Sequence, residues 1–244
     1  MNAWGLTDRG KVRSSNQDSF YLDIAHEEGH AILVVCDGMG GARAGNVASE
    51  LAVESFVDEV RRLIKPGVNN RFLRNTLDHA VTRANHVVYE KSRSSEDFIG
   101  MGTTLVGAIA TAHLAVIANV GDSRAYLINR EGIFRVTRDH SVVEDLLGKG
   151  EITPQEARNH PSKNLITRAL GTEPEINCDL FSLELRPDDI LLLCSDGLTN
   201  VVEEAEILYE VLQGADLSSS CTHLLALANA RGGPDNITIV IASF

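Results

Sequence analysis

The stretch Ala31–Gly41, AILVVCDGMGG, joins an unbroken apolar run to an aspartate and a cluster of glycines. The apolar run is too short for a buried helix, and the glycines end it, so it predicts a buried strand with Asp37 at its end. A second stretch, Ile190–Gly197 (ILLLCSDG), repeats the arrangement with Asp196. Two buried strands that each end in a carboxylate are therefore the starting point for the fold.

Two further carboxylates, Asp122 and Asp235, lie at the ends of other predicted strands. Each alone is a common turn signal, because aspartate beside glycine or proline favours turns. If the strands are neighbours, however, the acids converge, and two carboxylates about 4 Å apart repel by roughly 4 kcal/mol at an effective dielectric of about 20. Such a cluster takes up protons or hard divalent cations. We therefore predict a cation site at these strand ends.

The composition is that of an ordinary globular chain. Its 244 residues are 43% hydrophobic, enough for a large core, and we expect one domain spanning residues 1–244. The net charge of -12 argues against nucleic acid or an anionic membrane surface as partner. No apolar run approaches the roughly 20 residues of a membrane span, and residues 1–11 lack the apolar core of a secretory signal, so we expect a cytoplasmic protein.

Thiol chemistry is disfavoured. The four cysteines show no paired spacing, and none is followed six positions later by an arginine, as the C-x5-R loop of cysteine-dependent phosphatases requires.

The order of predicted elements indicates sheets packed face to face with helices outside. Helical periodicity covers residues 47–63, 72–88, 203–212 and 218–230, whereas strands are predicted over 3–7, 20–24, 31–36, 105–110, 114–120, 125–128, 133–136, 176–185, 190–194 and 237–242. We expect the four strands between 105 and 136 to be hairpin-linked and antiparallel. The fold class is then α+β, a four-layer αββα sandwich of two antiparallel sheets flanked by helix pairs.

Residues 141–174 interrupt this pattern with short helical pieces and no clear strand. We interpret the segment as a flap insertion, a mobile element that covers the cleft and selects substrate proteins.

Seven motifs together resemble the metal-dependent serine/threonine protein phosphatases of type 2C (the PPM family), in their bacterial form. They occur in the family's order: RSSNQD (13–18), DGMGG (37–41), GTT (102–104), GDSR (121–124), DHS (139–141), SDG (195–197) and GPDNIT (233–238). Each motif is loose, but seven in order make chance similarity very improbable. The flap sequence HPSKNLITRALG (160–171) also looks like the bacterial members.

The resemblance implies a centre of two Mn²⁺ or Mg²⁺ ions in a cleft at one end of the sandwich, with a third, weaker position beside it. The ligands that it assigns are Asp37, which would bridge both ions, the backbone carbonyl of Gly38, then Asp196 and Asp235, with Asp122 and Asp196 at the third position.

Three more residues receive roles from the same resemblance. Asp18 would act on the metal centre through water, and Asn236 belongs to the catalytic set. Arg13 is the candidate phosphate clamp, because a guanidinium fork matches two phosphate oxygens. Taken without the resemblance, Arg13 would be interpreted as a solvated loop arginine.

The implied reaction is hydrolysis of phosphoserine and phosphothreonine monoesters on proteins by a metal-activated water. The implied partners are phosphorylated proteins and a cognate serine/threonine kinase, and we expect a monomer. The alternative is a catalytically weak regulatory module that binds phosphoproteins, although such a module predicts lost metal acids, whereas Asp37, Asp196 and Asp235 are all present.

Met39 stands where many eukaryotic members carry a histidine proposed as general acid, so this chain needs another proton donor. Gln17 stands where those members often have glutamate, so one metal position lacks a carboxylate. His140 is given no catalytic role.

A nucleotide-binding interpretation of the glycine-rich turn at residues 38–45 fails, because a P-loop needs Lys followed by Ser or Thr where Asn46 and Val47 stand.

Overall fold

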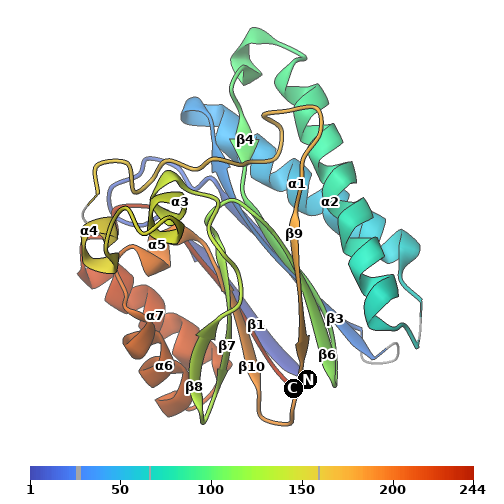
Figure 1. Ribbon diagram of the computed structural model, residues 1–244, viewed down its shortest axis with the longest axis vertical. Helices are drawn as coiled ribbons and strands as arrows, with labels where there is room; N and C mark the ends of the chain where they lie inside the picture. Colours follow the sequence, from blue (N-terminus) through green and yellow to red (C-terminus); the bar gives the residue numbers. More distant parts are fainter. Residues whose placement is uncertain (26–28, 66, 159) are drawn as a thin grey trace.

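Two antiparallel sheets lie face to face at the centre of the molecule (Figure 1), in a computed structural model that describes residues 1–25, 29–65, 67–158 and 160–244. The first sheet has the strand order β1-β11-β10-β7-β8 and the second β2-β3-β5-β6-β9, with β4 paired to β3. The strands are β1 (Asn2–Asp8), β2 (Asp18–Ala25), β3 (His30–Met39), β4 (Gly102–Thr103), β5 (Leu105–Thr111), β6 (Leu114–Val120), β7 (Arg124–Asn129), β8 (Gly132–Arg135), β9 (Asp179–Glu184), β10 (Ile190–Cys194) and β11 (Ile237–Ser243).

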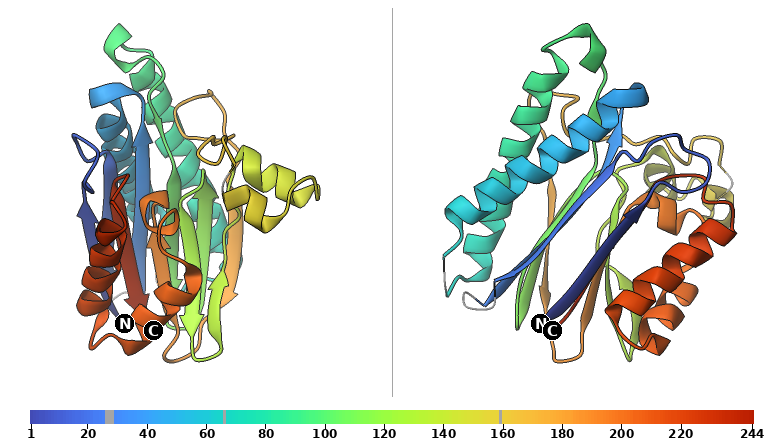
Figure 2. Two further views of the ribbon diagram at one scale, coloured as in Figure 1. Left: turned by 90° about the vertical axis from the view of Figure 1, so that its left-hand side faces the viewer. Right: turned by 180° about the vertical axis from the view of Figure 1, so that it is seen from behind.

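Helices cover the outer faces of both sheets, as the view from behind in Figure 2 shows. The long helices α1 (Gly41–Leu63) and α2 (Asn70–Ser92), followed by the short 3-10 helix η1 (Glu96–Phe98), lie on the second sheet, while α6 (Glu204–Gln213) and α7 (Leu217–Ala230) lie on the first. A one-turn helix, α5 (Asp196–Thr199), follows β10. The predicted four-layer αββα sandwich is confirmed.

Burial on both faces explains the unbroken apolar runs of β3 and β10. In β3, Ile32 and Val34 face α1 and α2, whereas Leu33 and Val35 face the opposite sheet. In β10, alternate leucines likewise pack against the helices or against the other sheet. Because successive side chains point to opposite faces of a strand, a strand in the middle of four layers needs apolar residues at every position.

The connection between β6 and β7 differs from the prediction. The hairpin pairs β5–β6 and β7–β8 exist, but β6 belongs to the second sheet and β7 to the first, so the four strands are not one run of hairpins. Gly121, at φ 102, opens the short crossing between the sheets. A left-handed glycine turn redirects the chain there, which strand periodicity does not reveal.

The strand predicted over residues 176–185 is also shorter than expected. Its pairing with β6 begins only at Asp179, opposite Asn119, because the residues before it turn back toward the flap.

The flap segment contains two short helices, α3 (Val142–Gly148) and α4 (Pro154–Arg158), and no strand among its described residues. Ser141 caps α3 by accepting a hydrogen bond from the Glu144 N–H. An isolated bridge between Ser141 and Ile166 closes the flap on itself, and a second bridge joins Leu170 of the flap to Thr103 of β4. It lies at the end of the sandwich away from the two termini (Figure 1).

Within the described ranges, no helix is both long and apolar enough to cross a membrane.

Candidate metal and phosphate site

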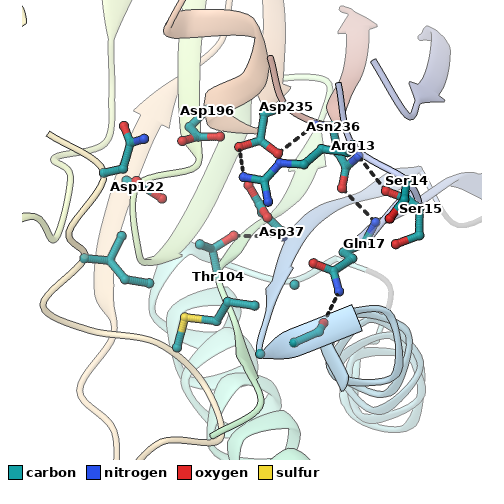
Figure 3. Close-up of a pocket in the computed structure, with 16 residues that line it drawn as sticks. Arg13, Ser14, Ser15, Gln17, Asp37, Thr104, Asp122, Asp196, Asp235 and Asn236 are labelled. Atoms are coloured by element: carbon teal, nitrogen blue, oxygen red, sulfur yellow. Dashed lines mark hydrogen bonds and ion pairs between the residues drawn. The ribbon is translucent and has the colours of Figure 1, made fainter. Parts of the chain in front are cut away.

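A pocket of about 420 Å³ opens beneath the flap, between the ends of the two sheets (Figure 3). Seven of the eight predicted site residues line it: Arg13, Asp37, Gly38, Asp122, Asp196, Asp235 and Asn236. The eighth, Asp18, is buried in β2 directly opposite Asp37 of β3 in the strand register. The fold thus brings the strand-end carboxylates together, as the sequence analysis expected.

Asp37 is fixed by Thr103, the last residue of β4, and by Thr104, which follows it. Its N–H donates to Thr104 Oγ1 at 2.9 Å, and its carbonyl accepts from the Thr104 N–H and from Thr103 Oγ1, each at 2.9 Å. The Thr104 hydroxyl also lies 2.7 Å from Ser123 Oγ. The GTT and GDSR motifs therefore hold the backbone of Asp37, which leaves its side chain directed into the pocket (Figure 3).

Gly38 is required by close packing. A Cβ at this position would lie 2.0 Å from the carbonyl oxygen of Gly45 in α1 and 2.7 Å from that of Gln17. Only glycine lets α1 and the Gln17 loop approach the end of β3 so closely. Gly197 is similar, since a Cβ there would lie 1.9 Å from the carbonyl oxygen of Asn236. These glycines draw the loops that carry the acids into one pocket.

Asp196 and Asp235 come from the ends of neighbouring segments of the first sheet. Asp196 is the first residue of α5, and its Oδ2 accepts from Asn200 Nδ2 at 2.8 Å. Asp235 Oδ2 accepts from a terminal guanidinium nitrogen of Arg13 at 2.7 Å, and Oδ1 accepts from the Asn236 N–H at 2.9 Å. Half of the Arg13 side chain is exposed, at 52%, so its guanidinium lies at the mouth of the pocket.

The Asn236 side chain binds the loop that carries Arg13. Its Nδ2 donates to the carbonyls of Arg9 and Ser15 at 2.9 and 3.0 Å, and its Oδ1 accepts from the Gln17 N–H at 2.8 Å. With the amide so engaged, Asn236 acts on the site by shaping this loop. Its role among the groups that contact substrate stays a prediction.

Burial and mutual repulsion raise the pKa of the clustered acids. Burial, followed by the charges of Asp18, Asp196, Asp122 and Asp235, holds the pKa of Asp37 well above its usual range. Burial is likewise the largest cause for Asp18, whose pKa is raised to about 7, for Asp122, raised to about 8, and for Asp196, raised to about 6. The raised pKa values favour the protonated forms when no cation is bound, and divalent ions would displace these protons.

The donor set fits hard divalent cations. The Oδ1 atoms of Asp18 and Asp196 are buried and have no hydrogen-bond partner among the described residues. In the same ranges, no group of three or more Asp, Glu, His or Cys side chains completes a metal site alone. A cation here would therefore draw part of its coordination shell from water, as Mg²⁺ usually does in proteins.

His140 holds the turn that precedes Asp122. Its Nδ1 accepts from the Gly121 N–H at 3.1 Å, and its own N–H donates to the Gly121 carbonyl at 2.9 Å. Because Nδ1 is an acceptor, Nε2 carries the proton in the neutral ring and faces Asp179 Oδ2 at 3.3 Å. The His140 carbonyl accepts from the Thr167 N–H at 2.8 Å, so the ring and backbone connect the flap to the pocket.

Gln17 and Met39, the two positions that depart from the eukaryotic pattern, both line the pocket. Gln17 donates from Nε2 to the Gly41 carbonyl at 2.7 Å and so joins its loop to the start of α1. Met39 lies on the pocket wall, where its thioether has no proton to transfer.

Sequence reasoning missed the hydroxyl residues around the acids. Thr104 and Ser123 hold Asp37, while Ser195 and Thr238 bind the Asp18 carboxylate. All four lie inside the motifs quoted from the sequence, and this position was the signal that could have identified them. A serine or threonine in a turn motif, however, usually indicates only a turn.

Comparison with known proteins identifies a family and several relatives. A family model described as protein phosphatase 2C matches residues 8–233. The serine/threonine phosphatase stp of Listeria monocytogenes is 41% identical over 244 residues, which cover 99% of this chain and 95% of that protein. Protein phosphatase PhpP of Streptococcus pneumoniae is 37% identical over 246 residues, covering 98% of this chain and 95% of that protein.

Solved structures show the same likeness. The serine/threonine phosphatase PstP/Ppp of Mycobacterium tuberculosis superposes with a TM-score of 0.89 at 36% identity, covering 100% of this chain and 98% of that one. A structure of the catalytic domain of PstP in complex with 2 manganese ions superposes with a TM-score of 0.87 at 36% identity, covering 99% and 97%.

Proposed function

On the premise that this chain belongs to the bacterial protein phosphatase 2C family and is a protein-serine/threonine phosphatase, we propose that its pocket hydrolyses phosphoserine and phosphothreonine on proteins with two Mn²⁺ or Mg²⁺ ions. The observation that carries the proposal is the cluster of carboxylates with raised pKa values, set beside a half-exposed arginine in one pocket. The carboxylates suit the cations, and the arginine suits the phosphate.

Each residue has a distinct part in the proposal. Asp37, Gly38, Asp196 and Asp235 would hold the two ions, and Asp122 with Asp196 would form a third position. Bound cations would supply the positive charge that lowers the pKa of an attacking water and neutralises the phosphoryl oxygens. All these ligands come from one chain, so a monomer suffices.

Arg13 would bind the phosphoryl group. Its guanidinium contacts Asp235 and feels the charges of Asp37 and Asp196, so it lies beside the proposed cation positions. A guanidinium can donate two parallel hydrogen bonds to a phosphate, which orients the ester for in-line attack. Met39 offers no proton and therefore takes no part in protonating the leaving group.

The flap would select among protein substrates, which we take to be products of a serine/threonine kinase. It lies over the pocket, to which it contributes Asn164 and Ile166. Exchanging residues 141–174 for the flap of a relative should change turnover of phosphoproteins more than turnover of p-nitrophenyl phosphate. Equal losses for both substrates would argue that the flap serves only the fold or the chemistry.

The decisive experiment measures phosphate release from a phosphothreonine peptide with Mn²⁺, after chelation, and after Mn²⁺ is restored. We expect turnover to vanish with chelator and to return with metal. Asp235→Ala should lose at least about 100-fold, because outer-shell changes at metal sites already cost about 10- to 100-fold. Asp58→Ala, an exposed carboxylate on α1, is the matched control and should be unchanged.

Two results would contradict the proposal. Turnover that survives chelation would exclude a metal-dependent reaction, and unchanged turnover in Asp235→Ala would exclude this pocket. Mn²⁺ binding without turnover in the wild type would favour the alternative, a regulatory module that binds phosphoproteins.

A further inference from the structure

The carboxylate of Asp18 is held by two hydroxyl groups from the opposite sheet. Ser195 Oγ and Thr238 Oγ1 both donate to Asp18 Oδ2, each at 2.7 Å. Ser195 and Thr238 are fully buried, and Asp18 is 7% exposed. Asp18 belongs to β2 of the second sheet, whereas Thr238 belongs to β11 of the first and Ser195 directly follows β10. The contact therefore bridges the two sheets beside the pocket.

The direction of each hydrogen bond follows from its partners. When Asp18 is ionised, as it would be beside bound cations, its carboxylate only accepts, so the single proton of each hydroxyl points to Asp18. Ser195 Oγ in turn accepts from the Thr238 N–H at 3.0 Å. Thr238 Oγ1 lies 2.7 Å from Thr7 Oγ1, which must then be the donor, and Thr7 Oγ1 accepts from Asn16 Nδ2 at 2.8 Å. Every hydroxyl along this path has a defined role.

The second oxygen of the Asp18 carboxylate, Oδ1, takes no part in this network. Asp18 Oδ1 is buried and has no partner among the described residues, although buried polar atoms normally find one. Asp18 stands opposite Asp37 in the β2–β3 register, and after burial its charge is the largest cause of the raised pKa of Asp37. The two hydroxyls thus occupy one oxygen of Asp18, and the second oxygen, on a residue paired with Asp37, has no partner among the described residues.

We propose that Ser195 and Thr238 are positioning residues that hold Asp18 by Oδ2, so that Oδ1 stays directed to the cations and their bound water. The inference rests on the proposed metal-dependent function. Neither Ser195 nor Thr238 lines the pocket, so both would act through Asp18. Partners that orient the acids around a metal centre typically change metal affinity or activity by about 10- to 100-fold when removed.

A purely structural role is the competing explanation, because a buried hydroxyl that bridges two sheets also stabilises the sandwich. The two roles differ in what they change. Loss of a structural contact lowers the melting temperature and leaves the Mn²⁺ affinity of the folded protein unaltered. Loss of a positioning contact weakens Mn²⁺ binding even where the protein remains folded.

The test uses Thr238→Val, which keeps the shape of the side chain and removes the hydroxyl, and Thr238→Ser, which keeps the hydroxyl. Mn²⁺ affinity is measured by titration calorimetry without substrate, and the melting temperature is recorded with chelator. Thr238→Val should bind Mn²⁺ about 10- to 100-fold more weakly, and Thr238→Ser should stay close to the wild type. Thr76→Val, a buried threonine in α2 away from the pocket, is the matched control.

The outcome is decisive either way. Wild-type Mn²⁺ affinity in folded Thr238→Val, or equal loss in Thr238→Ser, would overturn the proposal. If Thr238→Val does not fold, Ser195→Ala removes the second donor to the same oxygen and is judged by the same criterion. Because Mn²⁺ affinity is measured without turnover, a failure of the proposed phosphatase reaction would appear separately, as a wild-type protein that binds Mn²⁺ and releases no phosphate.

Discussion

Replacing Asp196 by asparagine should stabilise the protein when no metal is present. Burial, and then the charge of Asp235, raise the pKa of Asp196 from its ordinary 3.8 to about 6. Between these two pH values the folded protein keeps a proton that the unfolded chain has released, so stability falls as pH rises through this window. Above about pH 6 Asp196 is ionised in the folded protein as well, and its buried charge lowers the free energy of unfolding by the full amount. Asparagine cannot ionise, so the variant does not suffer this loss.

The magnitude follows from the width of the window. The pKa of Asp196 differs by about two units between the folded and unfolded states, and each unit corresponds to about 1.4 kcal/mol. The full effect on the free energy of unfolding is therefore about 3 kcal/mol, which is an upper value. Asp196 is only half-buried, and its neighbours share the protons, so we expect a gain of about 1 to 3 kcal/mol at pH 7. The hydrogen bond from Asn200 survives, since the new amide oxygen can still accept it.

The assay is urea denaturation of both proteins in chelator between pH 4 and pH 8. The difference in the free energy of unfolding should be near zero at pH 4 and reach its full value above about pH 6. Asp58→Asn, an exposed carboxylate on α1, controls for the general loss of one negative charge.

Saturating Mn²⁺ should remove most of the stability advantage of the variant. A ligand at 100 times its dissociation constant stabilises the folded state by about 2.7 kcal/mol, and Asp196→Asn should lose much of that gain. The reasoning is refuted if the metal-free variant is no more stable than the wild type at pH 7, or if the difference does not depend on pH.

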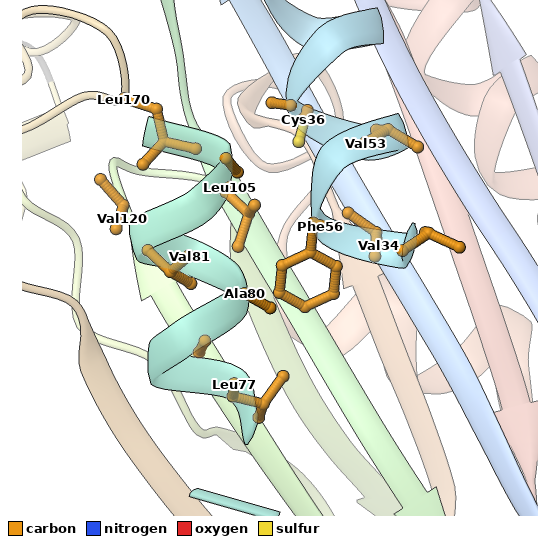
Figure 4. Close-up of a cluster of buried hydrophobic side chains, with 14 of the residues drawn as sticks. Val34, Cys36, Val53, Phe56, Leu77, Ala80, Val81, Leu105, Val120 and Leu170 are labelled. Carbon is orange, nitrogen blue, oxygen red and sulfur yellow. The ribbon is translucent and has the colours of Figure 1, made fainter. Parts of the chain in front are cut away.

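Two further predictions concern the surroundings of the site. His140→Ala should lower the free energy of unfolding by about 1 to 3 kcal/mol at pH 8, because the buried Gly121 N–H loses its acceptor. Burial lowers the pKa of His140, so the stability that the neutral ring contributes is lost as pH falls below the ordinary 6.5. In urea denaturation, the difference in the free energy of unfolding between wild type and variant should therefore be smaller at pH 5 than at pH 8. In the cluster of Figure 4, a Cβ on Gly107 would lie 2.7 Å from Phe56 Cζ, so Gly107→Ala should destabilise by about 1 to 3 kcal/mol. Adding Phe56→Leu should recover part of this loss, and a strictly additive double variant would show that the two positions do not compete for space.

Much of the fold could be predicted because its middle layers leave a strong local signal. A strand buried on both faces is apolar at every position, as in residues 31–36 and 190–194, and long helices on the outside show a single apolar face. The carboxylates at the strand ends were visible for the same reason, because an acid after such a run must lie at the edge of the core. Asp37 and Asp196 were found in this way.

The assignment of strands to sheets was beyond the sequence. The segment after Val120 reads like another hairpin, yet the chain crosses there from one sheet to the other. Strand periodicity records that a residue is buried and does not record which neighbour buries it. The sheet that β7 joins depends on the backbone angle φ of Gly121 and on the pairing of β7 with β10, which is distant in the chain.

The sequence by itself determined which acids end buried strands, that they suit cations, and, through the order of the motifs, which family the chain resembles. Only the tertiary structure decided how those acids are held: Asp18 by Ser195 and Thr238, and the Arg13 loop by Asn236. The partners in these contacts lie far apart in the chain, and those of Asp18 belong to the opposite sheet. Local patterns follow the period of one strand or helix, whereas a hydrogen bond across the sandwich depends on the register of two sheets and on the distance between them.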